Sequence, residues 1–80
     1  MDEQELKICK EAWEIQKQLF IDNGQNDMLV RLEVMVRLMG AEETYKLCAF
    51  EQNDVPEEAC EVLKYALIYL EYSQAPPGLN

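Results

Sequence analysis

Apolar side chains recur along this chain at the spacing of helix faces, and no stretch alternates with the two-residue period of a strand. Four segments follow the helical pattern, and each is bounded by residues that favour helix ends. The pattern therefore predicts an all-α fold, a compact bundle of four helices, two long and two short, with no sheet. We expect residues 1–74 to form a single helical domain and residues 75–80, which include two prolines, to form a flexible C-terminal tail.

The first predicted helix begins at Asp2, with Glu5 as its capping-box partner, and ends at Asn23 and Gly24. Its apolar residues cover about half of the helix circumference. They are Leu6, Ile8, Cys9, Ala12, Trp13, Ile15, Leu19 and Phe20. Because this arc is so wide, we expect it to contact two neighbouring helices at once.

Gly40 divides the next apolar stretch into two predicted short helices, 27–39 and 41–52. Helix 27–39 has only three polar residues after its first position. A helix that is apolar nearly all round is typical of the centre of a bundle, so we expect this helix to be the central one. Helix 41–52 has a narrower apolar stripe.

The fourth predicted helix begins with Asp54 and Glu57, a second capping box with proline in the first turn, and runs to about residue 72. Its core stripe consists of Ala59, Val62, Leu63, Ala66, Leu67 and Leu70. Three tyrosines lie beside this stripe, with Ile68 at one edge. Their rings either cover the margin of the core, with the hydroxyls in water, or form a separate surface. Interfaces are enriched in tyrosine and depleted in lysine, so we predict a docking or dimer surface at Tyr65, Tyr69, Tyr72 and Ile68.

The chain has sixteen acidic and seven basic residues, a net charge of −9, and no histidine. This charge repels nucleic-acid phosphates and anionic lipid, and it favours basic protein partners. Without histidine, the chain lacks the commonest general base and the commonest metal ligand. Most of the acidic residues lie at predicted helix starts, where the helix dipole favours negative charge. We therefore expect no enzyme, no catalytic residue, no cofactor, no metal, no direct binding of nucleic acid and no membrane association.

The three cysteines, Cys9, Cys48 and Cys60, are an odd number without the close spacing of a zinc site. We expect them to be reduced and to fill helix faces as small apolar residues. A reducing compartment and the absence of an apolar leader predict a cytoplasmic protein.

These observations favour a small, non-catalytic, acidic helical protein that acts through protein–protein contacts, with a protein partner or as a homodimer. The alternative is an acidic inhibitor of the phage or mobile-element type, which occupies a basic nucleic-acid-binding site on a target protein. That function needs a continuous acidic surface. A third class is a ligand-binding bundle that uses Met28, Met35 and Met39, and a deep apolar pocket beside Met35 would favour it.

Overall fold

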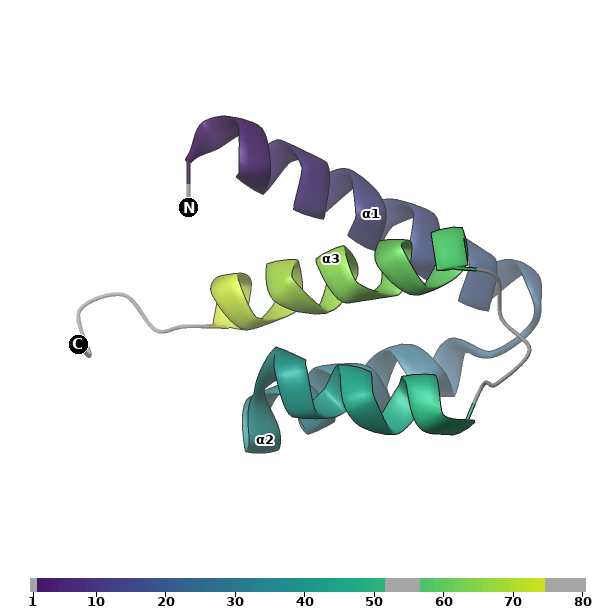
Figure 1. The fold of residues 1–80 in the computed structure, drawn as a ribbon. Helices are drawn as coiled ribbons and strands as arrows, with labels where there is room; N and C mark the ends of the chain where they lie inside the picture. Colours follow the sequence, from purple (N-terminus) through teal and green to yellow (C-terminus); the bar gives the residue numbers. More distant parts are fainter. Residues whose placement is uncertain (1, 52–56, 75–80) are drawn as a thin grey trace.

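The computed structural model describes residues 2–51 and 57–74. Nearly all of these residues lie in three α-helices: α1 (Glu3–Asp22), α2 (Asn26–Glu51) and α3 (Glu57–Gln74). No strand occurs in the two described ranges, so the prediction of an all-α fold is confirmed. Figure 1 shows α3 between α1 and α2. Both outer helices pack against α3, and they contact each other far less.

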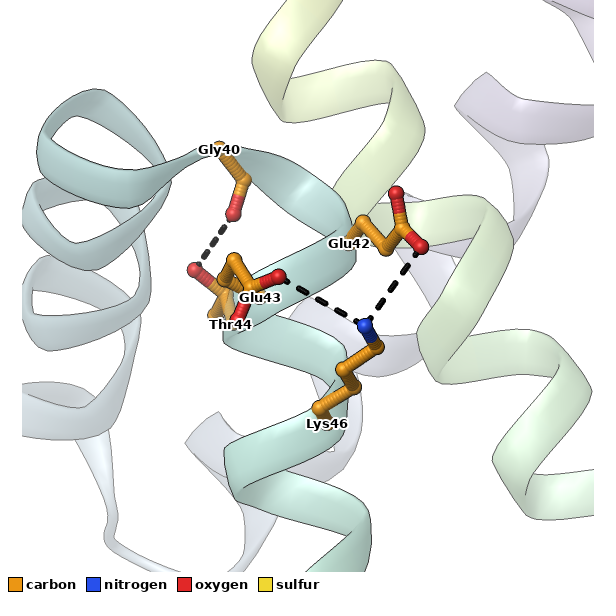
Figure 2. A network of polar contacts seen from close by, with 5 residues as sticks. All are labelled: Gly40, Glu42, Glu43, Thr44 and Lys46. Atoms are coloured by element: carbon orange, nitrogen blue, oxygen red, sulfur yellow. Dashed lines mark hydrogen bonds and ion pairs between the residues drawn. The ribbon is translucent and has the colours of Figure 1, made fainter.

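The prediction of four helices is wrong, because the predicted helices 27–39 and 41–52 are two limbs of α2, the longest helix of the three. Inside α2, Gly40 departs from helical geometry, with φ 88° and ψ 165°. The chain reverses direction at this residue (Figure 2). No loop separates the limbs, because glycine adopts positive φ without the steric cost that other residues pay. Below, residues 26–39 are the N-terminal limb and residues 41–51 are the C-terminal limb.

The reversal at Gly40 is supported by a buried polar contact (Figure 2). Thr44 is fully buried, and its hydroxyl donates a hydrogen bond of 2.8 Å to the Gly40 carbonyl. On the outside of the same turn, Lys46 Nζ lies 3.6 Å from a carboxylate oxygen of Glu42 and 3.5 Å from one of Glu43. Exposed ion pairs of this kind contribute about 0.5 kcal/mol or less. The conformation of Gly40 and the burial of Thr44 therefore do more to hold the turn.

Both ends of α1 lie where the sequence predicts them. The Asp2 carboxylate accepts a hydrogen bond of 2.8 Å from the Glu5 N–H, as an N-cap does. At the other end, the Asn23 backbone N–H donates to the Leu19 carbonyl at 3.1 Å, and Gly24 follows with φ 70°. These are local signals, so the sequence alone locates them.

The core is built around α3, which is the central helix in place of the predicted 27–39. Its buried residues are Leu63, Ala66, Leu67 and Leu70. They pack against Ala12 and Trp13 of α1 and against Leu32, Val36 and Ala41 of α2. A fully buried leucine stabilises a fold by about 1.5–3 kcal/mol. Because α3 carries this stripe between the two other helices, its leucines stabilise both contacts.

Two sequence predictions lie outside the described residues: the capping residue Asp54 and the tail 75–80. Within the described ranges, none of the helices combines the length and the hydropathy needed to cross a lipid bilayer.

Candidate docking surface

The four predicted surface residues of α3 fall into two groups. Tyr65 and Tyr72 are exposed, with 41% and 50% of their area accessible, and they lie seven residues apart on one face of the helix. Tyr69 and Ile68 are partly buried and pack against the core. Tyr65 and Tyr72 are therefore open to a partner, whereas Tyr69 and Ile68 form the edge of the core.

A hollow of about 300 Å³ lies between α1 and α3 beside Tyr65. It is lined by Glu5, Ile8 and Cys9 of α1 and by Tyr65 and Ile68 of α3. Ile8 is itself exposed. The exposed tyrosine of one helix and the exposed isoleucine of the other thus border the same hollow, together with Glu5.

The apolar arc of α1 is only partly covered, because its packing is almost entirely with α3. Cys9, Ala12 and Trp13 are buried, but Ile8, Ile15 and Leu19 are exposed. At 100° per residue these three side chains share one face of the helix, to one side of the buried residues. The helix contacts both neighbours, as predicted, but α2 only weakly, and part of the apolar arc faces solvent.

We call Ile8, Ile15, Leu19, Tyr65 and Tyr72 the α1/α3 surface. The two helices that carry it are acidic. Five acidic residues and three lysines lie in α1, and four acidic residues and one lysine lie in α3, so their combined net charge is −5. Sequence reasoning identified the tyrosines of this surface and missed its aliphatic half on α1. The signal that could have found that half is the width of the α1 arc.

The chemistry available beside the hollow is limited. Burial, and then the nearby Glu5 carboxylate, raise the pKa of the Cys9 thiol above its usual value, so this thiol stays protonated at neutral pH. The three cysteines form no disulfide in the described structure. Among the described residues, no three His, Cys, Asp or Glu side chains are grouped so that they could hold a metal ion.

A second hollow, of about 490 Å³, lies between the C-terminal limb of α2 and α3. Its lining mixes apolar residues with two glutamates and two lysines: Ala41, Glu42, Tyr45, Lys46, Lys64, Ile68 and Glu71. One of these lysines, Lys46, already pairs with Glu42. Neither hollow is lined by the methionines of α2 on which the ligand-binding interpretation depends.

Comparison of the chain with family models, with curated proteins and with solved structures finds no match. The functional assignment therefore rests on the surfaces of the molecule itself.

Proposed function

We propose that the protein is a small, non-catalytic contact protein whose α1/α3 surface binds another protein. The observation that carries this proposal is that exposed side chains from two helices, Tyr65 and Ile8, border one hollow. Single exposed apolar residues are common on any protein and need no explanation. Apolar residues that adjoin across two elements are less common on a monomer, and they are typical of interaction sites.

The residue types support the same function. Tyrosine offers a large, rigid contact area together with a hydroxyl that can hydrogen-bond at the rim of an interface, and it is common among residues that dominate binding. Isoleucine and leucine beside it can be desolvated without leaving a polar group unpaired. The first property is supplied by the exposed Tyr65 and Tyr72. The second is supplied by the exposed Ile8, Ile15 and Leu19.

The net charge of the two helices that carry the α1/α3 surface indicates the partner's chemistry. With a net charge of −5 on the two helices, a second acidic surface of the same kind would be repelled. A partner with an apolar patch and a rim of lysine and arginine would be attracted at long range and matched on contact. We therefore assign this surface to a basic protein partner and not to a second copy of the chain.

The arrangement of the acidic residues gives less support to the inhibitor alternative. The acid-rich first turns of α1 and α3 contain Glu3, Glu5, Glu57 and Glu58. Figure 1 shows that α1 and α3 run antiparallel, so these turns lie at opposite ends of the helix pair. Such dispersed charge favours a contact protein over a mimic of nucleic acid, which needs a continuous acidic surface.

The proposal is tested by affinity capture from the native host with three forms of the chain: wild type, the double variant Ile8→Ser/Tyr65→Ser, and the control Leu47→Ser. Leu47 is an exposed apolar residue on the C-terminal limb, outside the α1/α3 surface. We expect one protein to be retained by wild type and by the control and lost with the double variant. The partner, once purified, should bind the double variant at least about tenfold more weakly than wild type.

Circular dichroism of all three forms checks that the substitutions leave the helices intact. A partner that binds the double variant as tightly as wild type would contradict the proposed surface. Retention of no common protein by wild type and control would contradict the proposed function itself.

A further inference from the structure

A third apolar feature lies on the N-terminal limb of α2, away from both hollows. Val30, Val34 and Leu38 are spaced four residues apart, and 62%, 45% and 77% of their respective areas are accessible. We call these three residues the valine stripe. The same limb buries Leu32 and Val36 on its opposite side. The limb is therefore apolar on two faces, and the fold of one chain covers only one of them.

The charges beside the valine stripe balance, unlike those on the rest of the molecule. The N-terminal limb contains Asp27, Arg31, Glu33 and Arg37 and no other charged residue, so its net charge is zero in a chain of net charge −9. No ion pair involves Arg31 or Arg37 within the described ranges. Two acidic chains that approach each other meet the least repulsion where each surface is neutral.

From these observations we infer that a second copy of this chain covers the valine stripe, in a two-fold symmetric dimer held by the N-terminal limbs of α2. This interface is separate from the α1/α3 surface and does not depend on the function proposed for it. The dimer leaves both α1/α3 surfaces free, so one dimer presents two docking sites for the basic partner.

Helix geometry gives the dimer a defined form. Residues spaced by four form a ridge, and when such ridges from two helices interdigitate the axes cross at about −50°. With the two-fold axis near Val34, Val30 of each copy lies beside Leu38 of the other. The same packing brings Arg37 of each copy close to Glu33 of the other. Arg37 thereby gains a carboxylate partner across the interface. Because crossed helices touch over a short length, the interface is small and the dimer is weak.

Sedimentation equilibrium from micromolar to millimolar concentration tests the inference. We expect the mass to rise from that of the 9.3 kDa monomer towards twice this value. Val34→Ser should lower the association constant at least about tenfold, because it places a hydroxyl at the centre of the contact. The control Leu47→Ser, at an exposed leucine outside the stripe, should leave association unchanged.

Exchanging the charges of Glu33 and Arg37 distinguishes this two-fold dimer from dimers that use another surface. Glu33→Arg alone and Arg37→Glu alone should each weaken association, because each places like charges together across the two-fold axis. The double variant Glu33→Arg/Arg37→Glu keeps the net charge and should restore association. A monomer at every concentration, or weakening by Tyr65→Ser/Tyr72→Ser in place of Val34→Ser, would overturn the inference. Failure of the charge exchange to restore association would overturn the two-fold arrangement.

Discussion

The α1/α3 surface and the valine stripe are both apolar and exposed, but the helices that carry them differ in net charge. The first lies on two helices with a combined net charge of −5, and the second on a limb with a net charge of zero. Apolar area alone would make either one a candidate for any partner. The difference in charge separates them, because it sets which surfaces can approach. We therefore assign a basic partner to the α1/α3 surface and a second copy of the chain to the valine stripe.

The largest loss of stability should come from a core substitution in α3, the helix that supports both surfaces. Leu67 is fully buried on α3, and Leu67→Ala should lower the free energy of unfolding by about 2–5 kcal/mol. This change should weaken both kinds of binding together, because α1 and α2 are held in place through α3. Chemical denaturation gives the stability, and loss of one kind of binding without the other would show that the two surfaces do not share this support.

Gly40 sets the direction of the N-terminal limb, and substitution of this glycine tests that role. Gly24 serves as the matched control. Both residues have positive φ, but a β-carbon at Gly40 would also lie 3.2 Å from a Glu71 carboxylate oxygen, whereas Gly24 has open space. We expect Gly40→Ala to destabilise the fold by about 1–3 kcal/mol, and Gly24→Ala by less. Equal denaturation midpoints for the two variants would contradict the role given to Gly40 in the reversal of α2.

Ends and turns of this fold could be predicted from the sequence because they depend on local chemistry. Asp2 marks the start of α1, Asn23 and Gly24 mark its end, and Gly40 marks the reversal in α2. The helix count could not be predicted, because a glycine signals a break in helical geometry but not whether a loop follows it. A single residue suffices here, so one element turns back where two helices were expected.

Which apolar faces are covered could not be read from the pattern either. Helix 27–39 reads as central because it is apolar nearly all round, yet Val30, Val34 and Leu38 face solvent and α3 lies at the centre. Periodicity measures how much apolar surface a helix has, whereas burial depends on which neighbours reach it. The same limit applies to the candidate site. The spacing of the tyrosines is visible in the sequence, but it does not show that Tyr69 packs against the core while Tyr65 and Tyr72 are exposed.

Single substitutions can test whether Tyr69 belongs to the core and Tyr65 and Tyr72 to the docking surface. Tyr69 packs against the core, so Tyr69→Ser should cost about 1–2 kcal/mol of stability, somewhat less than the loss of a fully buried aromatic side chain. Tyr65→Ser and Tyr72→Ser should change stability by no more than about 0.5 kcal/mol, because both side chains are exposed. Thermal melts of the three variants compare them directly. A loss at Tyr65 as large as that at Tyr69 would place Tyr65 in the core instead of on the docking surface.

The smallest effect should be the response to salt, which should have opposite signs at the two surfaces. Raising the ionic strength shortens the screening length from about 30 Å at 0.01 M to about 8 Å at 0.15 M. Self-association should strengthen several-fold, because screening of the repulsion between two chains of net charge −9 outweighs the weakening of the exposed Arg37–Glu33 pairs, which contribute little. Binding of the basic partner should weaken over the same range. Sedimentation measures the first and calorimetry the second, and a dimer that dissociates in salt would contradict the role given to the neutral limb.

The most direct test of the difference between the two surfaces is an NMR dilution series on the assigned backbone amides of the whole chain. Each amide reports on its own surroundings, so the residues that change between high and low concentration locate the self-association surface. We predict concentration-dependent shifts for residues 27–38 of the N-terminal limb and unchanged shifts around Ile8, Tyr65 and Tyr72. Shifts confined to the α1/α3 surface, with residues 27–38 unaffected, would contradict the division of the two surfaces between a basic partner and a second copy.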